Sequence, residues 1–220
     1  MGLGINNRQR IAKRAAQEIK NGMIVNLGIG IPSLIPNYIP STIAVMFHAE
    51  NGIVGIGPSP VKGQEDENAC NAAGYPITTL AGSSYCDSAI AFGMIRKGYV
   101  DMTILGALEV SEQGDLANWI VPGKRVPGMG GAMELAQKVK KVVVLMNHTN
   151  KNGEPKLVKS CSLPLTAKRC VDLIITDQAV LKVENNRLIL IEVMSPYTVE
   201  EVLQATDATV ELSDSIKMIP

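Results

Sequence analysis

The chain of 220 residues is 46% hydrophobic and 19% charged, and its 21 basic residues balance its 21 acidic ones. This composition excludes an intrinsically disordered chain, and the zero net charge argues against non-specific binding to nucleic acid, which depends on clustered positive charge. No apolar run reaches the roughly 18 residues of a membrane-spanning helix, and the polar N-terminus lacks the apolar core of a signal peptide.

The first half of the chain alternates helical and strand patterns. The spacing of Ile11, Ala15 and Ile19 predicts a helix over residues 7–20, which ends at Asn21-Gly22. Further on, apolar runs predict strands, and a composition rich in Gly, Pro and Asn predicts a long loop. These expected elements are strands at 23–27, 42–47, 77–80 and 100–107, the loop at 55–76 and a helix at 87–98.

The second half begins with a Gly- and Pro-rich stretch over 114–131. A short helix is expected at 132–139 and a strand at 141–146, whereas the type of element that follows the polar turn at 147–154 stays open. The runs AVLKV and RLILIEV, on either side of Glu184-Asn-Asn186, predict a β-hairpin, and the pattern over 198–208 predicts a closing helix.

These elements together predict an α/β fold. We expect a single domain over residues 1–220, with a largely parallel central sheet covered by helices and with a C-terminal hairpin and helix. Ligands bind such sheets at the carboxyl ends of the strands. Glu50, Gly28, Gly30 and Gly106 all follow expected strands, so this edge is the expected site.

Cysteine and histidine are too sparse to indicate a disulfide framework or a metal site. The four cysteines, Cys70, Cys86, Cys161 and Cys170, form no Cys-x-x-Cys pair, and we interpret them as reduced thiols of a cytoplasmic protein. The two histidines, His48 and His148, cannot supply a His-rich metal site. No bound metal is expected.

Glu50 lies in the stretch MFHAENG (46–52), where an apolar run is followed by this one carboxylate and then by an Asn-Gly turn. A glutamate after a strand can be a solvated turn residue or a helix cap. A lone carboxylate at a partly buried edge can also act as a covalent nucleophile. His48 stands two residues earlier and would share a face with Glu50 in a strand, either as a packed core residue or as an orienting partner.

The glycine-rich turns also leave two interpretations open. Gly28-Ile-Gly30 does not complete a dinucleotide fingerprint, because position 33 is Ser and Pro32 disturbs the helix start. These glycines can form plain turns, or their N–H groups can face a bound thioester or phosphate. The run Gly128-Met-Gly-Gly131 opens a helix and is either a flexible turn or a donor to an anion or oxyanion.

These motifs resemble the β subunit of class I CoA-transferases, of the 3-oxoacid (succinyl-CoA or acetate) branch. That family carries Leu or Phe, then His or Gln, then Ser-Glu-Asn-Gly, and the chain has Phe47-His48-Ala49-Glu50-Asn51-Gly52. The resemblance spans almost the whole chain in order. Its other segments are NLGIGIP (26–32), EVSEQGDLANW (109–119), VPGK (121–124), GMGGAMEL (128–135) and CSLPLT (161–166).

The resemblance implies that Glu50 is the nucleophile of a ping-pong CoA transfer through a glutamyl-CoA thioester. The donor would be an acyl-CoA such as succinyl-CoA or acetyl-CoA, and the acceptor acetoacetate, another 3-oxoacid or a short-chain acid. It further implies that the N–H of Gly131 serves the oxyanion, that Gly28 and Gly30 line the thioester pocket, and that Asn51 steadies the Glu50 turn. CoA would be substrate and covalent intermediate, with no permanently bound cofactor.

Two departures and one absence refine these expectations. Ala49 stands where the family has Ser. In NAAGYPIT (71–78), Tyr75 stands near the place where the family has a Lys close to CoA, and both departures bear on acyl specificity. The family's other half bears a Gly-Gly-Phe motif that this chain lacks. The resemblance therefore implies that a CoA-transferase α subunit is the partner of this chain in an α2β2 heterotetramer. An acyl-CoA hydrolase on the same scaffold and a non-catalytic ligand-binding α/β domain are the alternatives.

Overall fold

A computed structural model describes residues 3–123 and 128–220 of the chain. The described residues cluster into two compact units, one comprising residues up to Gly106 with Lys138–Lys141, the other Ala107–Gln137 with Val142–Pro220. The single domain over residues 1–220 stays a prediction. Lys124 of the VPGK stretch and positions 125–127 of the expected loop lie outside the described residues.

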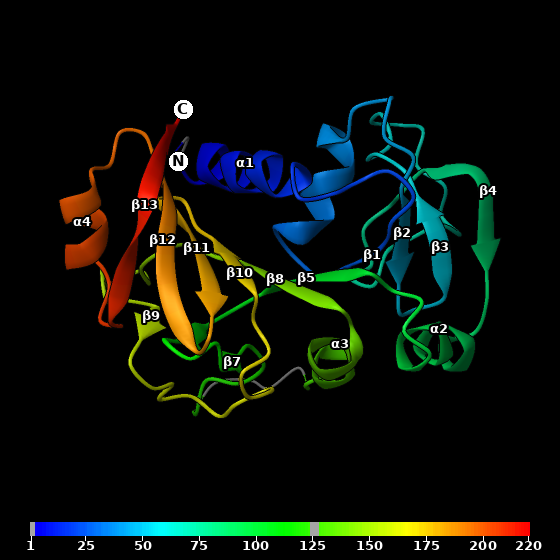
Figure 1. The fold of residues 1–220 in the computed structure, drawn as a ribbon. Coiled ribbons are helices and arrows are strands. Elements are labelled where there is room, and N and C mark those ends of the chain that lie inside the picture. Colours follow the sequence, from blue (N-terminus) through cyan, green and yellow to red (C-terminus); the bar gives the residue numbers. More distant parts are fainter. Residues whose placement is uncertain (1–2, 124–127) are drawn as a thin grey trace. The chain divides into compact units, whose positions relative to one another are not determined.

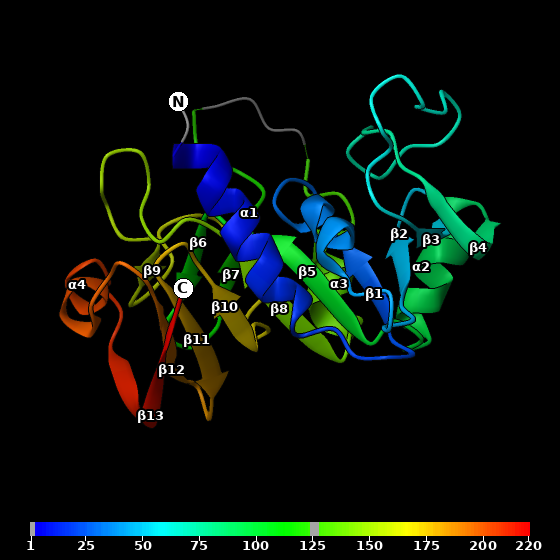
Figure 2. The same ribbon diagram turned by 90° about the horizontal axis from the view of Figure 1, so that it is seen from above.

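The first unit is a sheet in the order β5-β1-β2-β3-β4 (Figures 1 and 2). Strand β1 pairs in parallel with β5 and β2, whereas β3 and β4 add antiparallel strands at one edge. In chain order the elements are α1 (Leu3–Ala16), β1 (Ile24–Leu27), the 3-10 helix η1 (Pro32–Tyr38), β2 (Met46–Ala49), β3 (Ile53–Ile56), β4 (Thr79–Tyr85), α2 (Ser88–Arg96) and β5 (Met102–Gly106).

Strands β1, β2 and β5 are buried on both faces, as expected for parallel strands that are covered on both sides. Val25, Phe47 and Ile104 share one face and are at most 2% exposed, and the polar residues Asn26, His48 and Thr103 on the opposite face are fully buried. Helix α2 supplies part of this cover, since the carbonyl of Ala91 meets the buried ring of His48. The segment between β3 and β4, which corresponds to the expected loop, extends beyond the strands in Figure 2.

Several element boundaries differ from the sequence expectation: β4 covers Thr79–Tyr85 rather than 77–80, and β3 was not expected. Two of the shifts have identifiable reasons. Helix α1 ends at Ala16 rather than at 20, because the N–H groups of Gln17 and Glu18 turn back to carbonyls three residues earlier. Strand β2 starts at Met46 rather than at 42, because the N–H of Ala44 bonds to the side chain of Asn21. The shift carries β2 up to Ala49, so Glu50 follows the strand directly.

The second unit contains two sheets. In the larger sheet β10 pairs in parallel with β8 and antiparallel with β11. Strand β12 pairs antiparallel with β11 and in parallel with β13. The smaller sheet has the order β7-β6-β9. The elements are β6 (Glu109–Ser111), β7 (Leu116–Ala117), α3 (Ala132–Lys138), β8 (Lys141–Leu145), β9 (Leu157–Val158), β10 (Leu173–Ile175), β11 (Ala179–Glu184), β12 (Arg187–Met194), α4 (Val199–Gln204) and β13 (Val210–Ile219).

The C-terminal hairpin is confirmed, but the closing helix is followed by a strand that the sequence did not predict. Asn185 and Asn186 turn between β11 and β12 with φ of 53° and 59°, the signature of a tight hairpin turn. Helix α4 begins with a capping box of Thr198 and Glu201, and it ends at Gln204. The chain then returns as β13, which lies beside β12 in Figure 1.

Parallel strands at the centre and helices between successive strands confirm the α/β fold class. Within the described part of the chain, every helix is too short or too polar to cross a bilayer.

Candidate active site

Glu50 lies in a tight turn between β2 and β3, where the sequence placed it. The Gly52 N–H donates to the Ala49 carbonyl at 3.0 Å and closes the turn. Gly52 has φ +114°, and a Cβ built there would overlap the carbonyl oxygen of Cys86. Only glycine fits, so the geometry of this turn is fixed by the backbone, and the Glu50 side chain starts from a defined position.

The buried side chain of Asn26 holds the carboxylate of Glu50. Asn26 Nδ2 donates to Glu50 Oε2 at 3.0 Å, while Thr103 Oγ1 donates to Asn26 Oδ1 at 3.0 Å. Both supporting residues are fully buried, whereas Glu50 is half-buried. Among the described residues Glu50 Oε1 has no hydrogen-bond donor, so one carboxylate oxygen is held and the other is available to a reactant.

Strand pairing brings these polar residues together. Asn26 on β1 stands opposite His48 on β2 and opposite Thr103 on β5. Neither Asn26 nor Thr103 was expected from the sequence as a site residue. The available signal was a polar residue inside each apolar run, IVNL and MTILG, since a buried polar side chain in a strand needs a partner.

His48 completes the cluster as a buried, neutral ring. Its Nδ1 lies 3.2 Å from Asn26 Nδ2, and its Nε2 lies 3.2 Å from the carbonyl oxygen of Ala91 on α2. Burial lowers the pKa of His48 below its ordinary 6.5, although the nearby carboxylate of Glu50 acts in the opposite direction. His48 and Glu50 therefore meet the same amide, as expected for residues on one face of a strand.

Asn51 is exposed and ties the turn to the loop between β3 and β4. Its Nδ2 donates to the carbonyl oxygen of Cys70 at 2.9 Å. The contact links the residue after Glu50 to a segment 19 positions away in sequence. Asn51 is thus placed to steady the turn, without an observed contact to the Glu50 carboxylate.

Gly28 and Gly30 follow β1, at the expected edge of the sheet. The N–H of Gly28 already donates to the carbonyl of Ile104 at 2.9 Å, and a Cβ on Gly28 would lie 3.0 Å from that oxygen. Gly30 has φ +95°, and its carbonyl accepts a hydrogen bond from Ser33. Both positions favour glycine, but the Gly28 N–H is not available to a ligand in this arrangement.

Gly131 directly precedes α3, as the sequence predicted. Its carbonyl accepts from the N–H of Leu135 at 3.1 Å, which makes it part of the first helical turn. Gly131 belongs to the second unit, and its position relative to Glu50 stays a prediction.

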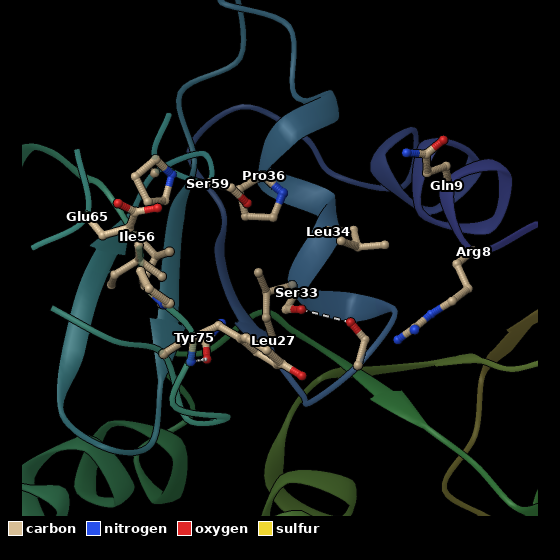
Figure 3. A pocket seen from close by; sticks show the side chains of 16 residues that line it. Arg8, Gln9, Leu27, Ser33, Leu34, Pro36, Ile56, Ser59, Glu65 and Tyr75 are labelled. Atoms are coloured by element: carbon tan, nitrogen blue, oxygen red, sulfur yellow. Dashed lines mark hydrogen bonds between the residues drawn. The ribbon is translucent and has the colours of Figure 1, made fainter. Parts of the chain in front are cut away.

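A cavity of about 470 Å³ lies in the first unit (Figure 3). Arg8 and Gln9 line it from α1, Ser33 and Leu34 from η1, and Tyr75 from the long loop. The volume suits a small organic ligand. Tyr75, at the position where the chain departs from the family pattern, is therefore part of a cavity wall. Glu50 is not a lining residue of this cavity.

Two of the sequence motifs support each other within the second unit. The N–H of Thr166 donates to the carbonyl oxygen of Leu116 at 2.7 Å, and the thiol of Cys161 lies 3.7 Å from the carbonyl oxygen of Asp115. Thr166 Oγ1 donates to Asn118 Oδ1 at 2.7 Å. The DLANW and CSLPLT stretches thus have a packing explanation in this structure.

A metal site has no support in the described residues, where no three His, Cys, Asp or Glu side chains gather in an arrangement that could hold an ion. The cluster around Glu50 instead combines an acceptor-only carboxylate with neutral donors. Such a set can orient a nucleophilic oxygen and stabilise charge on it.

Comparisons with known proteins give a consistent result. The family described as Coenzyme A transferase matches residues 8–205. A probable coenzyme A transferase β subunit of Bacillus subtilis (strain 168) is 62% identical over 212 residues, which cover 96% of this chain and 98% of that protein. A probable succinyl-CoA:3-ketoacid coenzyme A transferase subunit of the same organism is 53% identical over 209 residues, or 95% of this chain and 97% of that protein.

Among solved structures, an acyl-CoA transferase from Escherichia coli O157:H7, in a thioester complex with CoA, aligns with a TM-score of 0.76. It is 20% identical, and the alignment covers 97% of this chain but 43% of that chain. At this identity the likeness shows the fold alone.

Proposed function

The chain belongs to the coenzyme A transferase family and is a CoA-transferase, and on that premise we propose that Glu50 is its nucleophile. The observation that carries this proposal is the hydrogen bond from Asn26 Nδ2 to Glu50 Oε2. It fixes one oxygen of a half-buried carboxylate at the end of β2, where ligands of α/β sheets bind. A solvated turn residue would not need a fully buried amide as its partner.

The first half of the reaction takes two covalent steps. Glu50 attacks the carbonyl carbon of the donor acyl-CoA, and the carbon–sulfur bond breaks to release CoA thiolate and leave a mixed anhydride. The thiolate then attacks the glutamyl carbonyl, which releases the donor acid as a carboxylate and leaves a glutamyl-CoA thioester. The acceptor carboxylate reverses these steps and leaves as its CoA ester.

Asn26 serves this sequence by donating to the oxygen that Glu50 retains. During each attack on the glutamyl carbonyl that oxygen becomes negatively charged, and a prepositioned N–H in a buried site stabilises such charge. Thr103 fixes the amide from the other side by donating to Asn26 Oδ1. Asn26 is therefore proposed as a catalytic residue beside Glu50.

We also propose roles for the remaining expected site residues. The N–H of Gly131 stabilises the oxyanion, and Gly28 and Gly30 line the thioester pocket through their missing side chains. In support, a Cβ at Gly28 would press on the Ile104 carbonyl, and Gly30 has a positive φ. Asn51 steadies the Glu50 turn through its bond to the Cys70 carbonyl.

Substrates, partner and location are proposed from the names of relatives and the resemblance. The donor is an acyl-CoA such as succinyl-CoA or acetyl-CoA, and the acceptor is a 3-oxoacid such as acetoacetate or another short-chain acid. The relative at 53% identity is named for succinyl-CoA and a 3-ketoacid, which supports this class. We propose that a CoA-transferase α subunit is the partner in an α2β2 heterotetramer, that the location is cytoplasmic, and that CoA is a substrate rather than a resident cofactor.

Trapping of the intermediate tests the proposal. The chain, assembled with its α subunit, is mixed with succinyl-CoA and then with borohydride, which reduces a glutamyl thioester to an alcohol. Mass spectrometry is expected to locate the change on the peptide that contains Glu50. Glu50→Gln should abolish it, and Glu67→Gln, in the exposed loop, should not. An unmodified Glu50 in an assembly that binds CoA would refute the nucleophile assignment.

A further inference from the structure

We propose that His48 is a positioning residue: its unprotonated Nδ1 orients the Asn26 amide so that an N–H points at Glu50. The inference rests on the proposed role of Glu50 as nucleophile. It assigns a function to a buried histidine that does not itself touch the reacting atoms.

The orientation of the Asn26 amide follows from its partners. An ionised carboxylate can only accept hydrogen bonds, so the group 3.0 Å from Glu50 Oε2 must be the NH2 of Asn26 and not its oxygen. Oδ1 then faces Thr103, whose hydroxyl donates to it at 3.0 Å. A flipped amide would set two acceptors against each other at the nucleophile.

The same reasoning fixes the proton on His48. The second N–H of the Asn26 amide faces His48 Nδ1 at 3.2 Å and, at a longer 3.4 Å, the carbonyl oxygen of His48. An N–H on Nδ1 would stand against an amide nitrogen that can only donate, so Nδ1 is the unprotonated acceptor. The neutral ring therefore carries its proton on Nε2, which donates to the Ala91 carbonyl oxygen at 3.2 Å. Each polar atom of this buried chain, from Thr103 to Ala91, then has a complementary partner.

Protonation of His48 would disrupt this series of hydrogen bonds at the contact between His48 and Asn26. Imidazolium carries a proton on both nitrogens, so Nδ1–H would stand against the N–H of Asn26. The neighbours on β1 and α2, Asn26 and Ala91, are uncharged, and the charged group that acts on the ring is Glu50. Burial outweighs this carboxylate and lowers the pKa of His48, which keeps the ring neutral near pH 7. Acidic pH should therefore turn the amide away from Glu50.

Two substitutions separate positioning from packing. His48→Leu fills much of the space but offers no acceptor to Asn26, whereas His48→Gln offers both an acceptor and a donor and does not titrate. Each variant is assembled with the α subunit. Its kcat, its KM for succinyl-CoA and its yield of borohydride-trapped Glu50 are measured from pH 5 to 8 at roughly half-unit steps.

We expect His48→Leu to lower kcat by up to about 100-fold, with little change in KM, because a small misplacement of a reacting group is sufficient for such a loss. His48→Gln should recover most of kcat at pH 7. It should also remove the fall in kcat that we expect the wild type to show at acidic pH, where His48 becomes protonated.

The outcomes distinguish this inference from the function on which it rests. A folded His48→Leu variant with wild-type kcat would overturn the inference while Glu50 trapping still stands. If His48→Leu does not fold, a His48→Gln profile that falls with acid like the wild type would overturn it instead. Absence of Glu50 trapping in the wild-type assembly would refute the proposed function itself.

Discussion

Replacing Gly52 with alanine is expected to damage the turn that carries Glu50. A side chain at φ +114° is strained, and the new Cβ would overlap the carbonyl oxygen of Cys86. That oxygen belongs to backbone that is bonded to the turn, because the Cys86 N–H donates to the Gly52 carbonyl at 2.8 Å. Relief of the overlap must therefore separate two segments that hold each other.

The magnitude follows from these contacts. A residue forced into a sparsely populated φ region costs about 1–3 kcal/mol. Up to two hydrogen bonds are at risk, Cys86 N–H to the Gly52 carbonyl and Gly52 N–H to the Ala49 carbonyl, and each contributes about 0.5–1.5 kcal/mol. If both bonds are lost, we expect the free energy of unfolding to fall by about 2–6 kcal/mol.

The assay compares Gly52→Ala with a matched control, Gly153→Ala. Gly153 also has a positive φ, +81°, but no atom lies within 4 Å of its would-be Cβ. The control therefore carries the backbone cost alone, about 1–2 kcal/mol. Urea unfolding of the assembled enzyme at equal protein concentration gives the stability, and borohydride trapping gives the yield at Glu50.

The result that would refute this reasoning is specific. If Gly52→Ala unfolds at the urea concentration of Gly153→Ala and traps acyl-CoA with the wild-type yield, the Cys86 carbonyl does not constrain the turn. A stable Gly52→Ala variant with a lost trapping yield would show instead that the turn adapts but displaces Glu50.

Two further predictions concern the second unit. Burial lowers the pKa of His148 from 6.5 to about 4, so the unfolded chain binds more protons than the folded chain between these pH values, and the free energy of unfolding should fall by about 3 kcal/mol as the pH drops through that window. Urea midpoints should show a smaller fall for His148→Gln than for the wild type, and equal falls would contradict the assignment. Burial raises the pKa of Cys161 and Cys170 to about 12. Iodoacetamide at pH 8 should label the exposed Cys70 first, with these two thiols at least about 1,000-fold slower until denaturant is added, and equal rates would be the contrary result.

Much of the fold could be predicted from local patterns. Apolar runs located β1, β5 and β8, and the hairpin of β11 and β12 was marked by two asparagines between strand patterns. Strand β13 could not be predicted in this way. Its side chains are mostly exposed, so its sequence lacks the apolar run of a buried strand, and its pairing with β12 supplies the structure.

The site residues also differ in how far the sequence could predict them. Phe47-His48-Ala49-Glu50-Asn51-Gly52 is contiguous, and sequence alone was sufficient to single out Glu50 and its turn. The roles of Gly28, Gly30, Asn51 and Gly131 were expected from the resemblance and stay proposals.

The sequence by itself determined where a carboxylate leaves a buried strand, because strand pattern and turn chemistry act between neighbouring residues. Only the tertiary structure decided what holds that carboxylate. Asn26 is 24 residues from Glu50 and 77 from Thr103, and the parallel register of β1 with β2 and β5 sets them side by side. Register depends on the burial of whole strands and on their backbone pairing, so no local pattern encodes which polar side chains will meet.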